Sequence, residues 1–128
     1  MVVGPKTLAA LTVPTISAAA AAAGRAVPRV IAALPVCVTT DVDDARARAA
    51  KLFAIYAQLP SYRAMLDREG APTLADLAVA GSAHKVVDRL SALAGIGVTD
   101  FAAVDFSGTA GERAATREAL KELSATVA

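Results

Sequence analysis

The chain has 128 residues, the size of one ordinary domain, and much of its 55% hydrophobic fraction is alanine. Its 13 basic and 12 acidic residues leave a net charge of +1, and no run of one sign indicates a surface for nucleic acid or an anionic membrane. A single cysteine, Cys37, excludes an intrachain disulfide, and one cysteine with one histidine makes no metal site. We therefore expect one cytoplasmic region without a metal or a membrane span.

The chain opens with a predicted helix. Gly4-Pro5-Lys6-Thr7 suits a helix start, with proline in the first turn, and Gly24 is a natural helix end. Pro14 interrupts the pattern, which predicts a kink or two short helices in tandem. The short apolar segment before this helix, Met1–Val3, resembles the end of a strand.

Two strands are predicted further along. The first lies in Pro28–Asp41, the longest β-branched apolar run, whose lack of alternation is typical of a parallel strand buried on both faces. The second is Val98–Phe106, and a right-handed crossover should join the two in parallel. The other segments are predicted helices, at about 41–59, 61–69, 73–80, 82–94 and 110–126.

Two parallel strands do not make a covered sheet, because each strand needs neighbours on its edges. The fold class we predict is therefore α/β, as a partial (β/α)8 barrel: its C-terminal section, with about two parallel strands and several helices. The missing strands would lie upstream. In such a barrel the active-site residues lie at the carboxyl ends of the strands. That rule selects residues 4–7, 39–41 and 105–109.

Several motifs then carry a family resemblance. The most specific is Leu59–Gly70, LPSYRAMLDREG, and the others are Gly4–Leu8, Val13–Ile16, Pro28–Val30, Leu34–Thr39 and Gly95–Phe101. Over nearly the whole chain they resemble the C-terminal third of luciferase-like flavin- or deazaflavin-dependent oxidoreductases. The actinobacterial type that uses the deazaflavin coenzyme F-420 is the most similar.

This resemblance implies a (β/α)8 barrel in which the two strands are the seventh and eighth. It also implies hydride transfer between coenzyme F-420, or alternatively FMN, and a small organic substrate, or flavin-type monooxygenation. In this family most cofactor-contacting and catalytic residues follow earlier strands. No catalytic residue is therefore carried over, and the chain by itself is expected to lack a complete active site.

The candidates for cofactor binding are Gly4, Lys6 and Thr7. Together they offer free backbone N–H groups, an ammonium and a hydroxyl at a helix start, which can hold a phosphate or carboxylate. An ordinary helix start is the alternative interpretation. The other two selected segments, Thr39–Asp41 and Asp105–Thr109, favour plain helix capping over ligand contact.

The candidates for substrate binding are Tyr62 and Arg63, in the long segment between the two strands. An insertion after a barrel strand often covers the site, so Tyr62 can pack on a substrate and Arg63 can pair with an anion. Alternatively, Tyr62 packs inward and Arg63 pairs with Asp67, four residues on. His84, beside Lys85, is expected to be solvated.

Two functions remain open from the sequence. The first is the C-terminal part of an oxidoreductase that takes a small-molecule substrate, with an upstream barrel half as its partner. The second is a small non-catalytic α/β module for binding or assembly, which covers its strand edges by self-association into a homo-oligomer.

Overall fold

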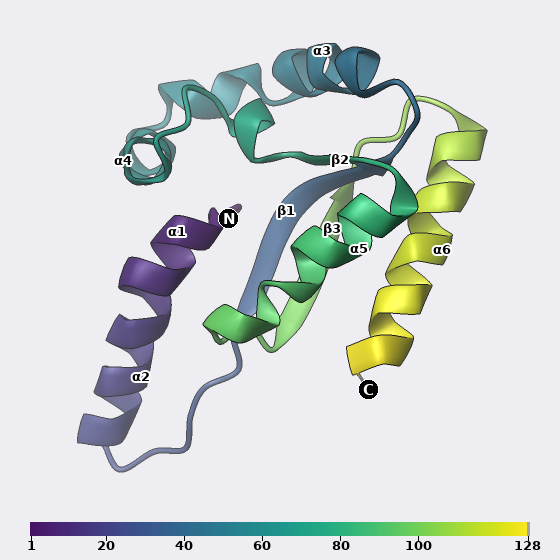
Figure 1. The fold of residues 1–128 in the computed structure, drawn as a ribbon. Helices are drawn as coiled ribbons and strands as arrows, with labels where there is room; N and C mark the ends of the chain where they lie inside the picture. The colour runs from purple at the N-terminus through teal and green to yellow at the C-terminus, as the bar shows by residue number, and fades with distance from the viewer. Residues whose placement is uncertain (128) are drawn as a thin grey trace.

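The computed structural model describes residues 1–127, built around a parallel sheet of three strands (Figure 1). The central strand β1 (Ile31–Val38) lies between β2 (Val79–Gly81) and β3 (Asp100–Asp105). β3 pairs with nearly all of β1, from Ile31 opposite Asp100 to Val36 opposite Asp105, whereas β2 reaches only the last three residues of β1. The predicted α/β class and the parallel pairing of the two long strands are confirmed.

Six helices surround the sheet within the described residues. They are α1 (Pro5–Thr7), α2 (Val13–Ala22), α3 (Val42–Leu52), α4 (Pro60–Glu69), α5 (Ala83–Ser91) and α6 (Ala110–Val127). A π-helical turn at Leu8–Thr12 joins α1 to α2 just before Pro14, so the expected interruption takes the form of two helices in tandem. Gly24 follows α2 in the left-handed conformation, with φ +63°, and ends it as expected.

The prediction of a helix at 73–80 is wrong in its second half. Leu74–Leu77 makes one 3-10 turn, closed by a capping box between Thr73 and Asp76, and the chain then extends into β2. Val79 is 2% exposed and pairs with Val36. A three-residue strand is too short to show a period of two in the sequence, so only its tertiary partner identifies it.

Two further boundaries differ from prediction. The helix expected over 41–59 ends at Leu52, and a 3-10 turn at Ala54–Gln58 continues the path to Pro60. Met1–Val3, expected to end a strand, lies outside the sheet. The N–H of Val2 instead donates to the hydroxyl of Tyr62 at 3.3 Å.

The two faces of the sheet are covered unequally. Alternate residues of β1, from Ala32 to Val38, face one helical layer in which α5 and α6 lie side by side (Figure 1). On the opposite face, Cys37 packs against the small residues of α3. Part of that second face is open, because Ile31 at the start of β1 is 66% exposed and Val104 near the end of β3 is 37% exposed. A parallel sheet is normally buried on both faces, so this apolar surface stands out.

Candidate functional site

The carboxyl edge of the sheet is the first candidate site. Ligands of open parallel α/β sheets bind outside the carboxyl ends of the strands. Here the turn from β1 into α3 meets the turn from β3 into α6, as the helix contacts of Arg48 and Glu112 show. Two of the segments selected from the sequence, 39–41 and 105–109, are therefore brought together.

Arg48 of α3 is the residue that joins these turns. Its Nε donates to the carbonyl oxygen of Phe106 at 3.0 Å, and its Nη2 donates to Oε2 of Glu112 at 3.0 Å. Its Nη1 pairs with Asp44, one helical turn earlier. With one guanidinium bound by two carboxylates and a carbonyl, the cluster serves as a tie between α3 and α6.

Glu112 occupies the position that an anionic ligand would need. Its Oε2 accepts from the N–H of Gly108 at 2.7 Å as well as from Arg48. The hydroxyl of Thr39, and then the N–H of Gly108 and the charge of Arg48, hold the pKa of Glu112 below its usual range against the opposing effect of burial. A side chain at Gly108 would displace the Arg48 guanidinium, because a Cβ there would lie 2.7 Å from Cζ of Arg48.

Cys37 lies beneath this cluster and is fully buried. Its Sγ is 3.8 Å from Nη2 of Arg48. Burial, reinforced by the charge of Glu112, nevertheless raises the pKa of the Cys37 thiol. A buried thiol with a raised pKa is a poor nucleophile, so the predicted role as a small core residue fits this environment.

Helix capping accounts for one polar residue in each of the two turns, Asp41 and Thr109. Asp41 caps α3, where its Oδ1 accepts from the N–H of Asp44 at 3.0 Å. Thr109 does the same for α6, accepting from the N–H of Glu112 at 3.1 Å. The capping interpretation of both segments thus matches the observed hydrogen bonds.

The start of α1 is the second candidate site, and a carboxylate of the chain itself lies there. Oε1 of Glu69, the last residue of α4, accepts from the N–H of Thr7 at 2.6 Å, and Oε2 accepts from the N–H of Lys6 at 3.2 Å. The ammonium of Lys6 donates to the carbonyl oxygen of Glu69 at 3.0 Å. A Cβ on Gly4 would lie 2.6 Å from Cγ of Glu69. The residues selected as an anion site thus bind an anion, and it is internal.

Sequence reasoning missed Glu69, although one local signal pointed to it. A carboxylate in the last turn of a helix faces the negative end of the helix dipole, which is unfavourable. The N-terminal end of α1, which carries the positive end of that helix dipole, binds the Glu69 carboxylate. The two residues in contact, Thr7 and Glu69, are more than sixty positions apart in the sequence. Thr7 itself is buried, and among the described residues its Oγ1 has no hydrogen-bond partner.

Tyr62 and Arg63, the residues selected for substrate contact, make contacts within the chain. Tyr62 is 9% exposed and packs on Tyr56 with 4.9 Å between ring centroids. Nε of Arg63 lies 3.4 Å from Asp67, and its Nη2 donates to the carbonyl oxygen of Pro72 at 3.1 Å. The inward-facing alternative describes this arrangement, and substrate contact by these residues stays a prediction.

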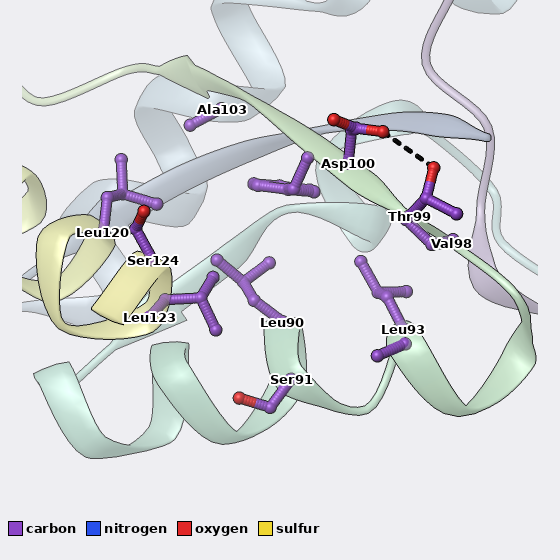
Figure 2. A pocket seen from close by; sticks show the side chains of 12 residues that line it. Leu90, Ser91, Leu93, Val98, Thr99, Asp100, Ala103, Leu120, Leu123 and Ser124 are labelled. Atoms are coloured by element: carbon purple, nitrogen blue, oxygen red, sulfur yellow. Dashed lines mark hydrogen bonds between the residues drawn. The ribbon is translucent and has the colours of Figure 1, made fainter. Parts of the chain in front are cut away.

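A groove of about 420 Å³ runs between α5, β3 and α6 (Figure 2). Leu90 of α5, Leu93 just after it and Leu123 of α6 reach into the groove, whereas the carboxylate of Asp100 points away to the other side of β3. Arg29 already binds that carboxylate. The groove is therefore mainly apolar, with the hydroxyl side chains of Ser91, Thr99 and Ser124 also in its lining.

Comparisons of the chain with protein-family models, with curated proteins and with solved structures found no match. The resemblance to luciferase-like oxidoreductases accordingly depends on the motifs of the sequence. Within residues 1–127, no three His, Cys, Asp or Glu side chains are grouped in a way that could hold a metal ion. In the same range, every helix is too short or too polar to cross a bilayer.

Proposed function

We propose that this chain is the C-terminal section of a luciferase-like (β/α)8 oxidoreductase and completes the barrel with upstream strands. The observation that carries the proposal is the uncovered part of the parallel sheet. Ile31 and Val104 are exposed on one face, and their strands are in register, with Ala33 opposite Ala102 and Pro35 opposite Val104. In a barrel this face would line the packed interior.

The strand edges support the same proposal. Within the described residues no strand pairs with the outer edge of β3, and β2 covers only Val36–Val38 of the other edge of β1. Barrel strands on either side would satisfy both edges. The α2, α5 and α6 helices contact the face of the sheet that would lie outside the barrel.

The proposed reaction is hydride transfer between coenzyme F-420, or FMN, and a small organic substrate. When bound, the cofactor supplies the hydride chemistry. The start of α1 suits an anionic part of such a cofactor: the Glu69 carboxylate stands in for it, Gly4 leaves the space, and the Thr7 hydroxyl is an unused donor. Gly4, Lys6 and Thr7 would hold that anion, and no residue of this chain is assigned the chemical step.

The test mixes the chain with a separately expressed segment that carries the first six strands of a luciferase-like barrel. We expect a one-to-one complex in sedimentation velocity that quenches deazaflavin fluorescence. The variant Ile31→Lys, at a position 66% exposed, should fold normally alone but fail to form the complex. A wild-type chain that stays separate from the upstream segment would contradict the proposal.

A second candidate function is an assembly module without chemistry, and the unpaired edge of β3 favours it. A second copy could extend the sheet at that edge. Sedimentation of the chain alone separates the two: a stable oligomer of defined size that does not bind flavin supports the assembly module, whereas a monomer supports the barrel section.

A further inference from the structure

A second pocket, of about 590 Å³, lies at the carboxyl edge of the sheet. Its lining includes Val42 at the start of α3, Ala80 of β2 and Phe106, which directly follows β3. Ligands of parallel α/β sheets bind outside the carboxyl ends of the strands, and pockets of roughly 300–1,000 Å³ hold small molecules. We propose that this pocket binds a small organic carboxylate, with its apolar body on the pocket floor and its charged end at Arg46 and Arg89. This site goes beyond the proposed function, because none of the residues at the start of α1 lines it.

Two arginines supply the positive charge of the pocket. Arg46 belongs to α3 and Arg89 to α5, two helices that lie on opposite sides of β2 (Figure 1). Both side chains are exposed, and within residues 1–127 neither guanidinium has an ion-pair partner, unlike Arg48, which two carboxylates bind. A guanidinium presents its donors in a planar fork that matches a carboxylate. Two unpaired guanidinium groups from different elements in one pocket therefore favour an anionic ligand.

The floor of the pocket is apolar. Five alanines line it, and three of them, Ala75, Ala78 and Ala80, pack against the cluster that contains Phe106. Because an alanine side chain ends at Cβ, these positions leave open the space that longer side chains would fill. An apolar group placed there would remove this surface from water, which favours a ligand with an apolar body over a bare inorganic ion.

One acidic residue limits the charge of the ligand. Among the described residues that line the pocket, only Asp76 is acidic, and its Oδ2 accepts from the N–H and the hydroxyl of Thr73 at 2.8 and 2.9 Å. The lining thus carries two positive charges against one negative charge. A single carboxylate matches this balance, whereas a polyphosphate would bring further negative charges close to Asp76.

The experiment titrates the full chain with benzoate and follows the backbone amides of Ala47 and Ala80 by NMR. We expect saturable shifts of both amides, and the neutral isostere benzamide should bind at least about tenfold more weakly, because it has no charge for the guanidinium groups. Arg46→Gln and Arg89→Gln should each weaken benzoate binding about fivefold, as for an exposed ion pair. Arg117→Gln, at an exposed position of α6 outside the pocket, is the matched control and should bind like the wild type.

A further variant separates a pocket from a patch of surface charge. Ala50→Leu fills part of the pocket and keeps both arginines, and leucine is a good helix former, so α3 should still form. This variant should lose saturable benzoate binding, and unchanged binding would overturn the proposal. If it does not fold, Arg89→Gln decides, since that change is at an exposed position.

Two results with the wild-type chain would also overturn the proposal. The first is an absence of shifts with benzoate, and the second is inorganic phosphate that binds as tightly as benzoate, which would show that the apolar floor contributes nothing. The titration needs neither the upstream segment nor the deazaflavin. Failure of the barrel proposal therefore leaves this result unaffected, and the two failures can be told apart.

Discussion

Replacing Gly4 with alanine tests whether Glu69 is held as tightly as its contacts indicate. The new Cβ would lie 2.5 Å from Oε2 of Glu69, so the carboxylate must leave. Two charge-assisted hydrogen bonds are then lost, each contributing roughly 1.5 kcal/mol at the low end. The backbone at Gly4 is extended, with φ −75° and ψ 160°, which alanine adopts freely. Alanine therefore regains about 0.4–1 kcal/mol through the unfolded state.

The expected net loss is roughly 2–3 kcal/mol of unfolding free energy, measured by urea unfolding followed by circular dichroism. In a Glu69→Ala background the same Gly4→Ala change should be neutral or stabilising, because nothing remains to collide with. Gly95→Ala is the control, since a Cβ there meets no atom within 4 Å. The reasoning is refuted if the Gly4 and Glu69 changes prove additive within about 0.5 kcal/mol.

Three further predictions concern the core and the carboxyl edge. Leu66→Ala, at a fully buried position, should lower the free energy of unfolding in urea by about 2–5 kcal/mol. Leu52→Ala, at a position 56% exposed, should change it by no more than about 0.5 kcal/mol, and equal effects of the two changes would contradict the packing. The lowered pKa of Glu112 means that its contribution to stability is complete above its ordinary value of 4.5 and is lost as the pH falls through the folded pKa. Glu112→Gln should therefore flatten the acid limb of the stability curve, and an unchanged limb would contradict stabilisation of the Glu112 carboxylate by Thr39, Gly108 and Arg48. Cys37 should react with iodoacetamide only at the rate of unfolding, because the thiol is buried and its pKa is raised; fast labelling of the folded chain would disagree.

Local chemistry made much of the fold predictable. The β-branched apolar run predicts β1. Asp41 caps the start of α3 and Gly70 ends α4, as their residue types indicate. Each of these features depends on a few neighbouring residues, so a short stretch of sequence contains the whole cause. The start of α1 likewise offers free N–H groups that its own sequence indicates.

Tertiary structure decided which groups come into contact at the start of α1 and at the carboxyl edge of the sheet. β2 exists because three residues pair with Val36–Val38, and nothing in their own composition distinguishes them from a helical segment. Glu69 reaches Thr7 across 62 positions, and Glu112 reaches Arg48 across 64. Such contacts follow from the packing of whole elements. The sequence by itself therefore determined the two long strands and most of the helices, while only the assembled chain could show β2 and the carboxylates that cap the start of α1 and bind Arg48.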